Sequence, residues 1–323
     1  MFSRRSALAG FGTLLAAPAL HAQPTGWAPT RPIRLIVTYP PGGVNDIVGR
    51  IVAEPLSHEL GQPVIVENRA GAGGNIGTQA AAQADADGHT ILFGTTAMFG
   101  VNPILYKSSG VDAVRDFDCL GTIGEVANVL SAVPSKLRAT TVAELIAEAK
   151  ARPLVYGSVG NGSSSHLSAV VFLKTAGIDA THVPYRGSSP LVAAMLASEV
   201  DFGFDTTATS TAHAKSGAIR PLAVTTSRRA SALPEVPTLK ESGMPDYDLG
   251  IWFGLFVSTR TPPEATRRLT EALEKTRTPQ TEQRLKTAYV ESLHIPRNQV
   301  ADWVKASAAR WQDIARDAHI AID

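Results

Sequence analysis

Short apolar runs rich in β-branched residues alternate along the chain with segments in which apolar residues recur at helical spacing. The run Ile33–Tyr39, for example, is followed by apolar residues spaced for one helix face between Ile47 and Leu60. This alternation is typical of α/β proteins. The runs that we predict as strands are Ile33–Tyr39, Val64–Glu67, Thr90–Gly94, Val129–Val133, Val155–Ser158, Thr181–Val183, Asp201–Asp205, Pro221–Thr225 and Trp252–Val257.

Boundary signals define several helices. Asn45 or Asp46 is the expected N-cap of the first helix and Gly61 its stop, while Pro55 predicts a kink or an early end. Thr141 begins a helix with a Thr-x-x-Glu capping box. The tail is predicted to be one amphipathic helix, because one face carries Val300, Trp303, Val304, Ser307, Trp311 and Ile314.

The order strand, Gly/Ser-rich loop, helix occurs twice. "PPGGVND" follows Ile33–Tyr39, and "VGNGSSSH" follows Val155–Ser158. Two such units predict two α/β lobes that each present one loop. Ligands of open parallel sheets bind beyond the carboxyl ends of the strands, where these loops lie.

Composition narrows the function classes. The chain has 323 residues, enough for two modest domains or one large one, with 44% hydrophobic and 18% charged residues. The formal net charge of +1 does not indicate a nucleic-acid groove or a polybasic membrane surface. We therefore expect a soluble globular protein without a nucleic-acid partner.

The N-terminus has the pattern of an export signal. Arg4 and Arg5 precede an apolar stretch from Ala7 to Leu20, and cleavage is expected after Ala22. The apolar stretch is too short and alanine-rich for a permanent membrane span. Residues 1–22 are thus predicted to be removed on export to the periplasm, by either the Sec or the twin-arginine route.

The sequence gives little indication of a metal site or of thiol chemistry. The only cysteine, Cys119, has no disulfide partner in the chain and is expected to be buried as a small hydrophobe. The eight histidines do not pair with a carboxylate or the cysteine at metal-ligand spacing. We predict neither a metal site nor a cofactor.

The first loop offers backbone amides. Gly42 and Gly43 permit close approach to a ligand, and the following helix adds the positive end of its dipole. A Walker A loop requires a lysine, which is absent, so a nucleotide phosphate is excluded. A tight turn without a ligand and a cradle for another anion both remain open.

Two more segments could belong to the same lobe's rim. "GAGGNIG", Gly71–Gly77, fails the dinucleotide pattern because Ile76 occupies the position of the last glycine. We predict a Gly-rich loop that leads into a helix near Asn75. Thr95 and Thr96 follow a predicted strand and could supply hydroxyl groups.

The second loop, Ser158–His166, is rich in hydrogen-bond donors. One alternative is an exported serine hydrolase with Ser163, His166 and Asp205 as its triad. The Gly-x-Ser-x-Gly elbow is absent, and a histidine three residues after a serine shares its helix face. Local packing or hydrogen bonding is the preferred interpretation of His166.

Another strand-to-helix junction carries Tyr185, Arg186 and Gly187. Arg186 could pair with an acid in a bidentate manner or lie on the surface. Asp205 ends a predicted strand and could bind a ligand ammonium group or cap the following turn, and we favour capping.

Six blocks in this order carry a resemblance to a known family. They are "YPPGGVNDIVGRIVAEPLSHELGQPVIVENRAGAGGNIGTQAAAQADADGHTILFGT", "NPILYK", "GSVGNGSSSHLS", "HVPYRGSSP", "LPEVPTLKESGMPDY" and "WFGLFVS". The chain resembles the periplasmic receptors of tripartite tricarboxylate transporters, also called Bug proteins.

The resemblance implies an α/β, type II periplasmic-binding-protein fold, with two lobes joined by crossing strands and a ligand cleft between them. Lobe 1 is expected at 29–125 and 228–323, and lobe 2 at 126–227. It also implies a non-enzymatic receptor that closes on a small organic acid and delivers it to membrane permease subunits. Monomeric action fits this role.

The resemblance further implies that the ligand carboxylate lies between the Pro40–Asp46 and Ser158–His166 loops. The residues expected at the ligand are Tyr39, Pro41, Gly42, Gly43, Val44, Asn45, Asp46, Thr95, Thr96, Ser158, Gly160, Asn161, Gly162, Ser163, Ser164, His166, Tyr185, Arg186, Gly187 and Asp205. None is expected to be catalytic.

This sequence departs from the family pattern at three places. The first loop commonly continues with Ser-Thr-Asp, whereas Val44 and Asn45 precede Asp46 here. This leaves the amide cradle intact but removes two hydroxyl groups. Lysine is usual at Arg186, and an asparagine is common after Asp205, where this chain has Thr206. Which acid is bound, and whether it carries an amine, therefore stays open.

Overall fold

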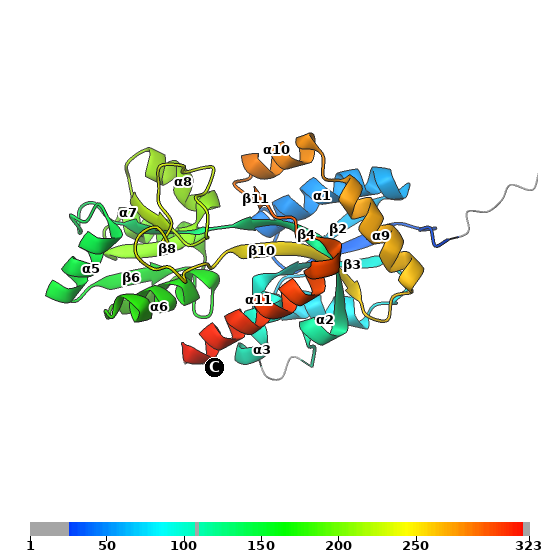
Figure 1. The fold of residues 1–323 in the computed structure, drawn as a ribbon, viewed down its shortest axis with the longest axis horizontal. Coiled ribbons are helices and arrows are strands. Elements are labelled where there is room, and N and C mark those ends of the chain that lie inside the picture. Colours follow the sequence, from blue (N-terminus) through cyan, green and yellow to red (C-terminus); the bar gives the residue numbers. More distant parts are fainter. Residues whose placement is uncertain (1–25, 107–109, 319–323) are drawn as a thin grey trace, which may run out of the picture.

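The computed structural model describes residues 26–106 and 110–318, so the export-signal prediction for residues 1–22 lies outside the described residues. The described chain forms two lobes, each built around one β-sheet with helices on its faces (Figure 1). The predicted two-lobe α/β fold is confirmed. No helix in the described part of the chain is long and apolar enough to cross a membrane.

The first lobe contains a six-stranded sheet in the order β11-β4-β10-β3-β1-β2. The three strands that begin the chain are parallel to one another, and β10 joins them antiparallel to β3. Apolar runs form their centres because both faces of the sheet are covered. The strands are β1 (Ile33–Val37), β2 (Val64–Asn68), β3 (Thr90–Thr95), β4 (Phe117–Val126), β10 (Ile251–Ser258) and β11 (Glu291–Ser292).

Helices of several lengths cover this sheet and connect its strands. Those of the N-terminal part are α1 (Val44–Leu60), the short η1 (Ala72–Gly74), α2 (Asn75–Gln83), η2 (Ala97–Val101), α3 (Asn102–Leu105) and α4 (Ala113–Asp116). Those of the C-terminal part are α9 (Pro263–Lys275), α10 (Pro279–Thr287) and α11 (Arg297–Asp317). The predicted helix start near Asn75 is confirmed.

The second lobe contains a five-stranded sheet in the order β7-β6-β8-β5-β9. Strand β6 is parallel to β7 and β8, whereas β5 is antiparallel to both of its neighbours. The strands are β5 (Asn128–Ala132), β6 (Val155–Ser158), β7 (Thr181–Pro184), β8 (Phe202–Thr206) and β9 (Arg220–Val224). The helices are α5 (Val142–Ala151), α6 (Ser164–Ala176), α7 (Ser188–Leu196) and α8 (Thr207–Lys215).

Two long antiparallel strands, β4 and β10, join the lobes (Figure 1). Only Ala127 separates the end of β4 from the start of β5 in the other sheet. The sequence did not predict β4, because Gly121 and Gly124 interrupt its apolar run. A glycine is required at Gly124, since a Cβ there would lie 2.7 Å from the Glu291 carbonyl oxygen.

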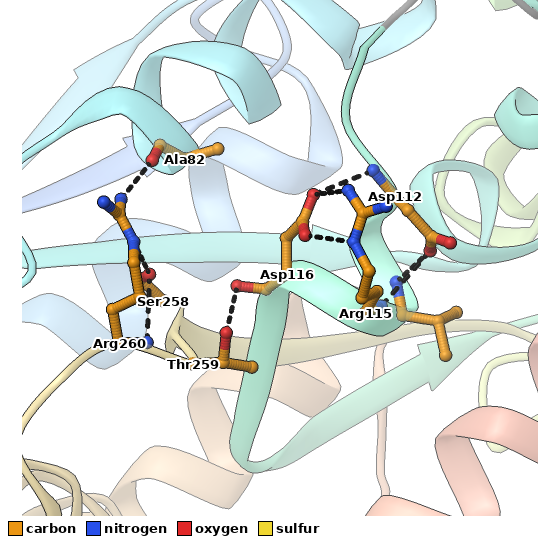
Figure 2. A network of polar contacts seen from close by, with 8 residues as sticks. Ala82, Asp112, Arg115, Asp116, Ser258, Thr259 and Arg260 are labelled. Carbon is orange, nitrogen blue, oxygen red and sulfur yellow. Dashed lines mark hydrogen bonds and ion pairs between the residues drawn. The ribbon is translucent and has the colours of Figure 1, made fainter.

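The outer ends of these strands are held by a polar network (Figure 2). The Thr259 amide donates to the Asp116 carbonyl at 3.0 Å, and Arg260 donates to the Ala82 carbonyl at 2.7 Å. Arg115 pairs with the Asp116 carboxylate at 2.7 Å. Because this end is tied to the first lobe, bending of the strands is expected at the opposite end, near Val126.

The boundary of the second lobe differs from the expected one. We expected 228–323 in the first lobe, but the segment 230–249 packs on the second sheet. The Leu239 amide donates to the Val224 carbonyl and the Leu249 amide to that of Thr225. Leu239 and Leu249 also belong to the apolar core of the second lobe. By these contacts, the second lobe extends to about residue 249.

Helix α11 packs against both lobes. Its first half, with Val300 and Val304, joins an apolar cluster with Trp252 and Phe256 of the first lobe. Trp311, further along, joins the core of the second lobe. Figure 1 shows the helix running beneath the crossing strands towards α6. The predicted apolar face of the tail is confirmed.

The helix boundaries are partly as expected. Gly61 ends α1 in the left-handed conformation, and Thr141 forms the predicted capping box. The predicted N-cap of α1 is wrong, because the helix already begins at Val44 with Gly43 as its N-cap. The early end at Pro55 is also wrong, since helical structure continues to Leu60. Cys119 in β4 keeps a small exposed part. Removal of its thiol from water raises the pKa of that thiol to about 12.

Candidate functional site

A cavity of about 780 Å³ lies between the two lobes. The first lobe contributes the loop between β1 and α1, the end of β3, and residues of η2 and α3. The second lobe contributes the loops before α6 and α7, while the crossing strands form part of the wall through Val126, Ile251 and Phe253. The described residues that line the cavity include no Asp, Glu, Lys, Arg or His. Any ligand here meets neutral side chains and backbone.

The first loop is held from behind by Asp46. This buried carboxylate accepts hydrogen bonds from the Gly42 amide at 3.0 Å and from Asn68 Nδ2 at 2.9 Å. It also pairs with Arg50 at 2.9 Å, and this guanidinium is the main reason why the pKa of Asp46 falls to about 2. Asn68 in addition donates to the Tyr39 carbonyl at 3.1 Å. Asp46 therefore shapes the loop and is not among the cavity-lining residues.

The start of α1 leaves backbone amides free towards the cavity. Its N-cap, Gly43, has no side chain to accept a hydrogen bond from the first turn. No hydrogen bond found in the described residues uses the amides of Gly43, Val44 or Asn45, and all three residues line the cavity. These N–H groups lie at the positive end of a 17-residue helix, which favours a bound anion.

Hydroxyl groups border the same wall. Thr95 and Thr96 are buried beside the cavity, and Thr96 Oγ1 accepts a hydrogen bond from the Trp252 amide at 2.9 Å. The Tyr39 hydroxyl donates weakly to the Gly73 carbonyl at 3.4 Å, and burial raises the pKa of this tyrosine. Tyr39 therefore stays neutral and can offer a hydroxyl group to a ligand.

The second loop uses two of its expected amide donors internally. The Gly160 amide donates to Ser158 Oγ and the Gly162 amide to His166 Nδ1, both at 3.2 Å. The amides of Asn161 and Ser164 make no hydrogen bond within the described structure, and both residues line the cavity. The amide donors of this loop that remain free are therefore those of Asn161 and Ser164.

Two stacked histidines make hydrogen-bond contacts with this loop. The rings of His166 and His182 lie 3.9 Å apart and nearly parallel, and His182 Nε2 lies 2.7 Å from Ser158 Oγ. Burial, followed by the neighbouring His182, lowers the pKa of His166 to about 4. Burial also lowers the pKa of His182. His166 is therefore a neutral acceptor for the Gly162 amide, and its predicted local role is confirmed.

The alternative hydrolase triad is not assembled. Ser163 Oγ donates to the Gly160 carbonyl at 2.7 Å and accepts from the His166 amide as the N-cap of α6. Asp205 is engaged by Ser188 Oγ, the Thr206 amide and Thr209 Oγ1 at 2.7 to 2.8 Å. None of these contacts forms a serine-to-histidine-to-aspartate relay.

The strand-to-helix junction at residues 185–187 contains one residue that lines the cavity and two that do not. Gly187 lines the cavity together with Ser188 and Ser189, which begin α7. Arg186 is exposed and is not part of the lining, in agreement with the surface alternative. Asp205 is buried behind the rim, where it binds Ser188 and caps the turn at Thr206.

The structure thus divides the expected ligand residues into two groups. Those that line the cavity are Tyr39, Pro41, Gly43, Val44, Asn45, Thr95, Thr96, Gly160, Asn161, Gly162, Ser163, Ser164 and Gly187. Those that lie outside the lining are Gly42, Asp46, Ser158, His166, Tyr185, Arg186 and Asp205.

Sequence reasoning missed several lining residues, most of them apolar. Val101 and Leu105 come from η2 and α3, Phe253 from a crossing strand, and Trp311 from α11, far away in the sequence. Apolar residues of this kind are typical of core positions, and Val101 and Trp311 lie in none of the six resembling blocks. Leu105, Tyr106 and Phe253 could have been found, because they lie in two of the six resembling blocks.

Comparisons with known proteins agree with this geometry. A profile of the family described as "Tripartite tricarboxylate transporter family receptor" matches residues 48–320. A UPF0065 protein encoded in the tcbD-tcbE intergenic region of Pseudomonas sp. (strain P51) is 34% identical over 315 residues, which cover 96% of this chain and 93% of that protein. Protein BugT of Bordetella pertussis is 37% identical over 253 residues, covering 76% and 77% of the two chains.

Solved structures show the same relationship. Rpa4515 of R. palustris with adipate superposes with a TM-score of 0.79 at 34% identity, covering 91% of this chain and 99% of that one. MatC of Rhodopseudomonas palustris with bound malate gives a TM-score of 0.74 at 26% identity, with coverages of 89% and 99%. The periplasmic binding protein BugD gives 0.76 at 30% identity, with coverages of 91% and 99%.

Proposed function

Because this chain belongs to the tripartite tricarboxylate transporter receptor family, we propose that it captures a small organic acid in the periplasm and delivers it to membrane permease subunits. The family and the structural neighbours are solute-binding receptors and not enzymes. The prediction that the chain is not an enzyme is thereby confirmed.

The observation that carries the proposal is the set of free amides around an uncharged cavity. Gly43, Val44 and Asn45 offer theirs from the first lobe, and Asn161 and Ser164 from the second. A hydrogen bond to a carboxylate contributes about 1.5–3 kcal/mol. Several such bonds in a closed cleft bind a small acid without any arginine or lysine.

Relatives support a carboxylate as the ligand class. Rpa4515 was solved with adipate and MatC with malate, and both cover nearly the whole of this chain. The two ligands share carboxylate groups and differ in their carbon skeletons. We therefore propose an organic acid as the ligand.

Capture would involve closure of the lobes about the crossing strands. The chain passes between the sheets at Ala127 and returns at Ile251, while the far ends of β4 and β10 are fixed to the first lobe. A bend there would bring the α1 and α6 starts together on the ligand. The closed form would present a surface that permease subunits distinguish from the open form.

A thermal-shift screen of the mature protein against mono-, di- and tricarboxylates tests the binding step. A ligand at 100 times its Kd adds about 2.7 kcal/mol to the free energy of unfolding. For a protein of about 300 residues, we expect Tm to rise by about 4 °C with a cognate acid. If no acid raises Tm at 10 mM while neutral or cationic solutes do, the proposed ligand class is wrong.

Delivery needs a separate measurement. Permease subunits reconstituted in vesicles should take up the labelled acid only when the loaded receptor is added outside. Uptake that is the same with and without the receptor would contradict delivery. N-terminal sequencing of protein recovered from the periplasm should begin at residue 23 if the export prediction holds.

A further inference from the structure

The cavity between the lobes contains, besides its free backbone amides, a cluster of polar side-chain groups around Gly73 in η1. From this cluster we infer that the ligand carries, in addition to its carboxylate, a hydroxyl or amino group that donates a hydrogen bond to Asn102 Oδ1. The inference rests on the proposed function of the same site and narrows its substrate class.

The central group of the cluster is the carboxamide of Asn102. This residue begins α3, is 5% exposed and lines the cavity. Its Nδ2 donates to the Gly73 carbonyl at 2.9 Å and to Asn75 Oδ1 at 3.0 Å. Because a carbonyl oxygen only accepts, the contact with Gly73 fixes which end of the carboxamide is Nδ2. Asn102 Oδ1 is left without a donor among residues 26–106 and 110–318.

Gly73 leaves a position open in front of this oxygen. A Cβ at residue 73 would lie 3.2 Å from Asn102 Oδ1 and 3.2 Å from the Tyr106 hydroxyl oxygen. The two groups therefore converge on the place that a side chain would fill. Gly73 has φ +64°, a conformation that favours glycine, and all three residues line the cavity. A small group of a ligand can take this place.

Two tyrosine hydroxyl groups lie at the same place. The Tyr39 hydroxyl is 3.4 Å from the Gly73 carbonyl, and that of Tyr106 makes no hydrogen bond in the described part of the chain. A phenol hydroxyl both donates and accepts, whereas the oxygen of Asn102 only accepts. The tyrosines can therefore bind either a ligand hydroxyl or a ligand amine, while Asn102 requires a donor.

A second acceptor in the first lobe also lacks a partner. Asn45 Oδ1, in the first turn of α1, is buried without a hydrogen bond from any described residue, and Asn45 lines the cavity. An acceptor kept from water without a partner costs free energy. A ligand carboxylate has only acceptors of its own and cannot supply the missing donors. A ligand O–H or N–H group can.

Titration calorimetry on sets of acids that differ only in the donor group tests the inference. Suitable sets are succinate, malate and aspartate; hexanoate, 6-hydroxyhexanoate and 6-aminohexanoate; and benzoate, 4-hydroxybenzoate and 4-aminobenzoate, all at pH 7.5 in 150 mM salt. They place the donor at different distances from the carboxylate. In the set that binds most tightly, we expect the hydroxyl or amino member to have a Kd about tenfold or more below that of the member without a donor, because the site's acceptors stay unpaired with the latter. The comparison of hydroxyl with amine shows which donor the cluster takes.

Two variants locate the effect at the cluster. Tyr106→Phe removes one hydroxyl group and should reduce the preference for the donor-bearing acid about threefold or more. Tyr289→Phe, at a tyrosine outside the cavity lining, is its control and should leave the preference unchanged.

Gly73→Ala fills the open position and should abolish the preference. Its control is Gly61→Ala, since Gly61 has a similar φ of +68° and a Cβ there meets open space. Thermal melts show whether each variant is folded at the temperature of the titration.

The outcomes separate the inference from the proposed function. If acids bind but neither donor lowers Kd in the native protein, the inference is overturned and the receptor function stands. The same holds if the preference persists undiminished in folded Tyr106→Phe and Gly73→Ala proteins. If no member of any set binds at 10 mM, both the inference and the proposed function are overturned.

Discussion

Removing the Val44 amide is the sharpest test of the backbone cradle. Val44 is the first residue of α1, the position where proline is best tolerated because its N–H has no partner in the helix. The preceding Gly43 has φ −79° and ψ 169°, the extended conformation that a residue before proline prefers. Val44→Pro should therefore fold normally while losing one donor at the cavity.

The expected loss follows from one hydrogen bond to a charged group. Such a bond contributes about 1.5–3 kcal/mol, so Kd should rise about 12- to 160-fold. Val44→Ala is the matched control, because it removes most of the side chain and keeps the N–H. It should change Kd by less than about threefold.

Titration calorimetry with the tightest acid from the screen gives both Kd values, and thermal melts report whether the variants fold. The reasoning would be refuted by a folded Val44→Pro protein whose Kd lies within threefold of that of Val44→Ala. In that case the ligand would be bound by side chains or by the other lobe, and the free amides at α1 would have no role in affinity.

Three further predictions concern stability, each followed by urea unfolding. Asp46→Asn should lose about 2 kcal/mol at pH 7; because the pKa of Asp46 is lowered, this contribution is present above about pH 4 and fades towards pH 2, and a difference independent of pH would count against it. Native His166 has a lowered pKa, so the protein should lose up to about 3 kcal/mol as pH falls from 6.5 to 4, whereas His166→Gln should lack this component; parallel pH profiles would contradict the buried neutral ring. Gly124→Ala should cost about 1–3 kcal/mol, since its Cβ would meet the Glu291 carbonyl, while Gly217→Ala, whose Cβ meets open space but whose φ is +76°, should cost less; equal costs would show that backbone strain and not the contact decides.

Periodicity was sufficient for most of the secondary structure. The apolar run of β1 and the face of α11 with Val300, Val304 and Trp311 lie as their spacing predicts. These patterns are local, because burial of one face imposes the period of the element itself. Strand β4 was not predicted by its periodicity, because glycines interrupt its apolar run. Gly124 is required there by the Glu291 carbonyl, which belongs to a residue far along the chain.

The candidate site was predicted in part, for a similar reason. Glycine-rich loops before helices mark where amides are exposed, and Gly43, Val44 and Asn161 do line the cavity. The direction of the polar side chains was not predictable. Asp46 turns away from the cavity because Asn68 and Arg50 lie behind it.

What the sequence determined by itself was a chain of α/β units with two anion-ready loops and a resemblance to one receptor family. Only the tertiary structure decided which donors remain free and what else surrounds them. Gly162 donates to His166, and the free amides of this loop are those of Asn161 and Ser164. Trp311 of α11 reaches a cavity formed mainly by residues 39–253. The physical reason is that a helix start or a Gly-rich turn follows from local sequence, whereas the partner that satisfies each polar group is supplied by segments that meet only in the folded protein.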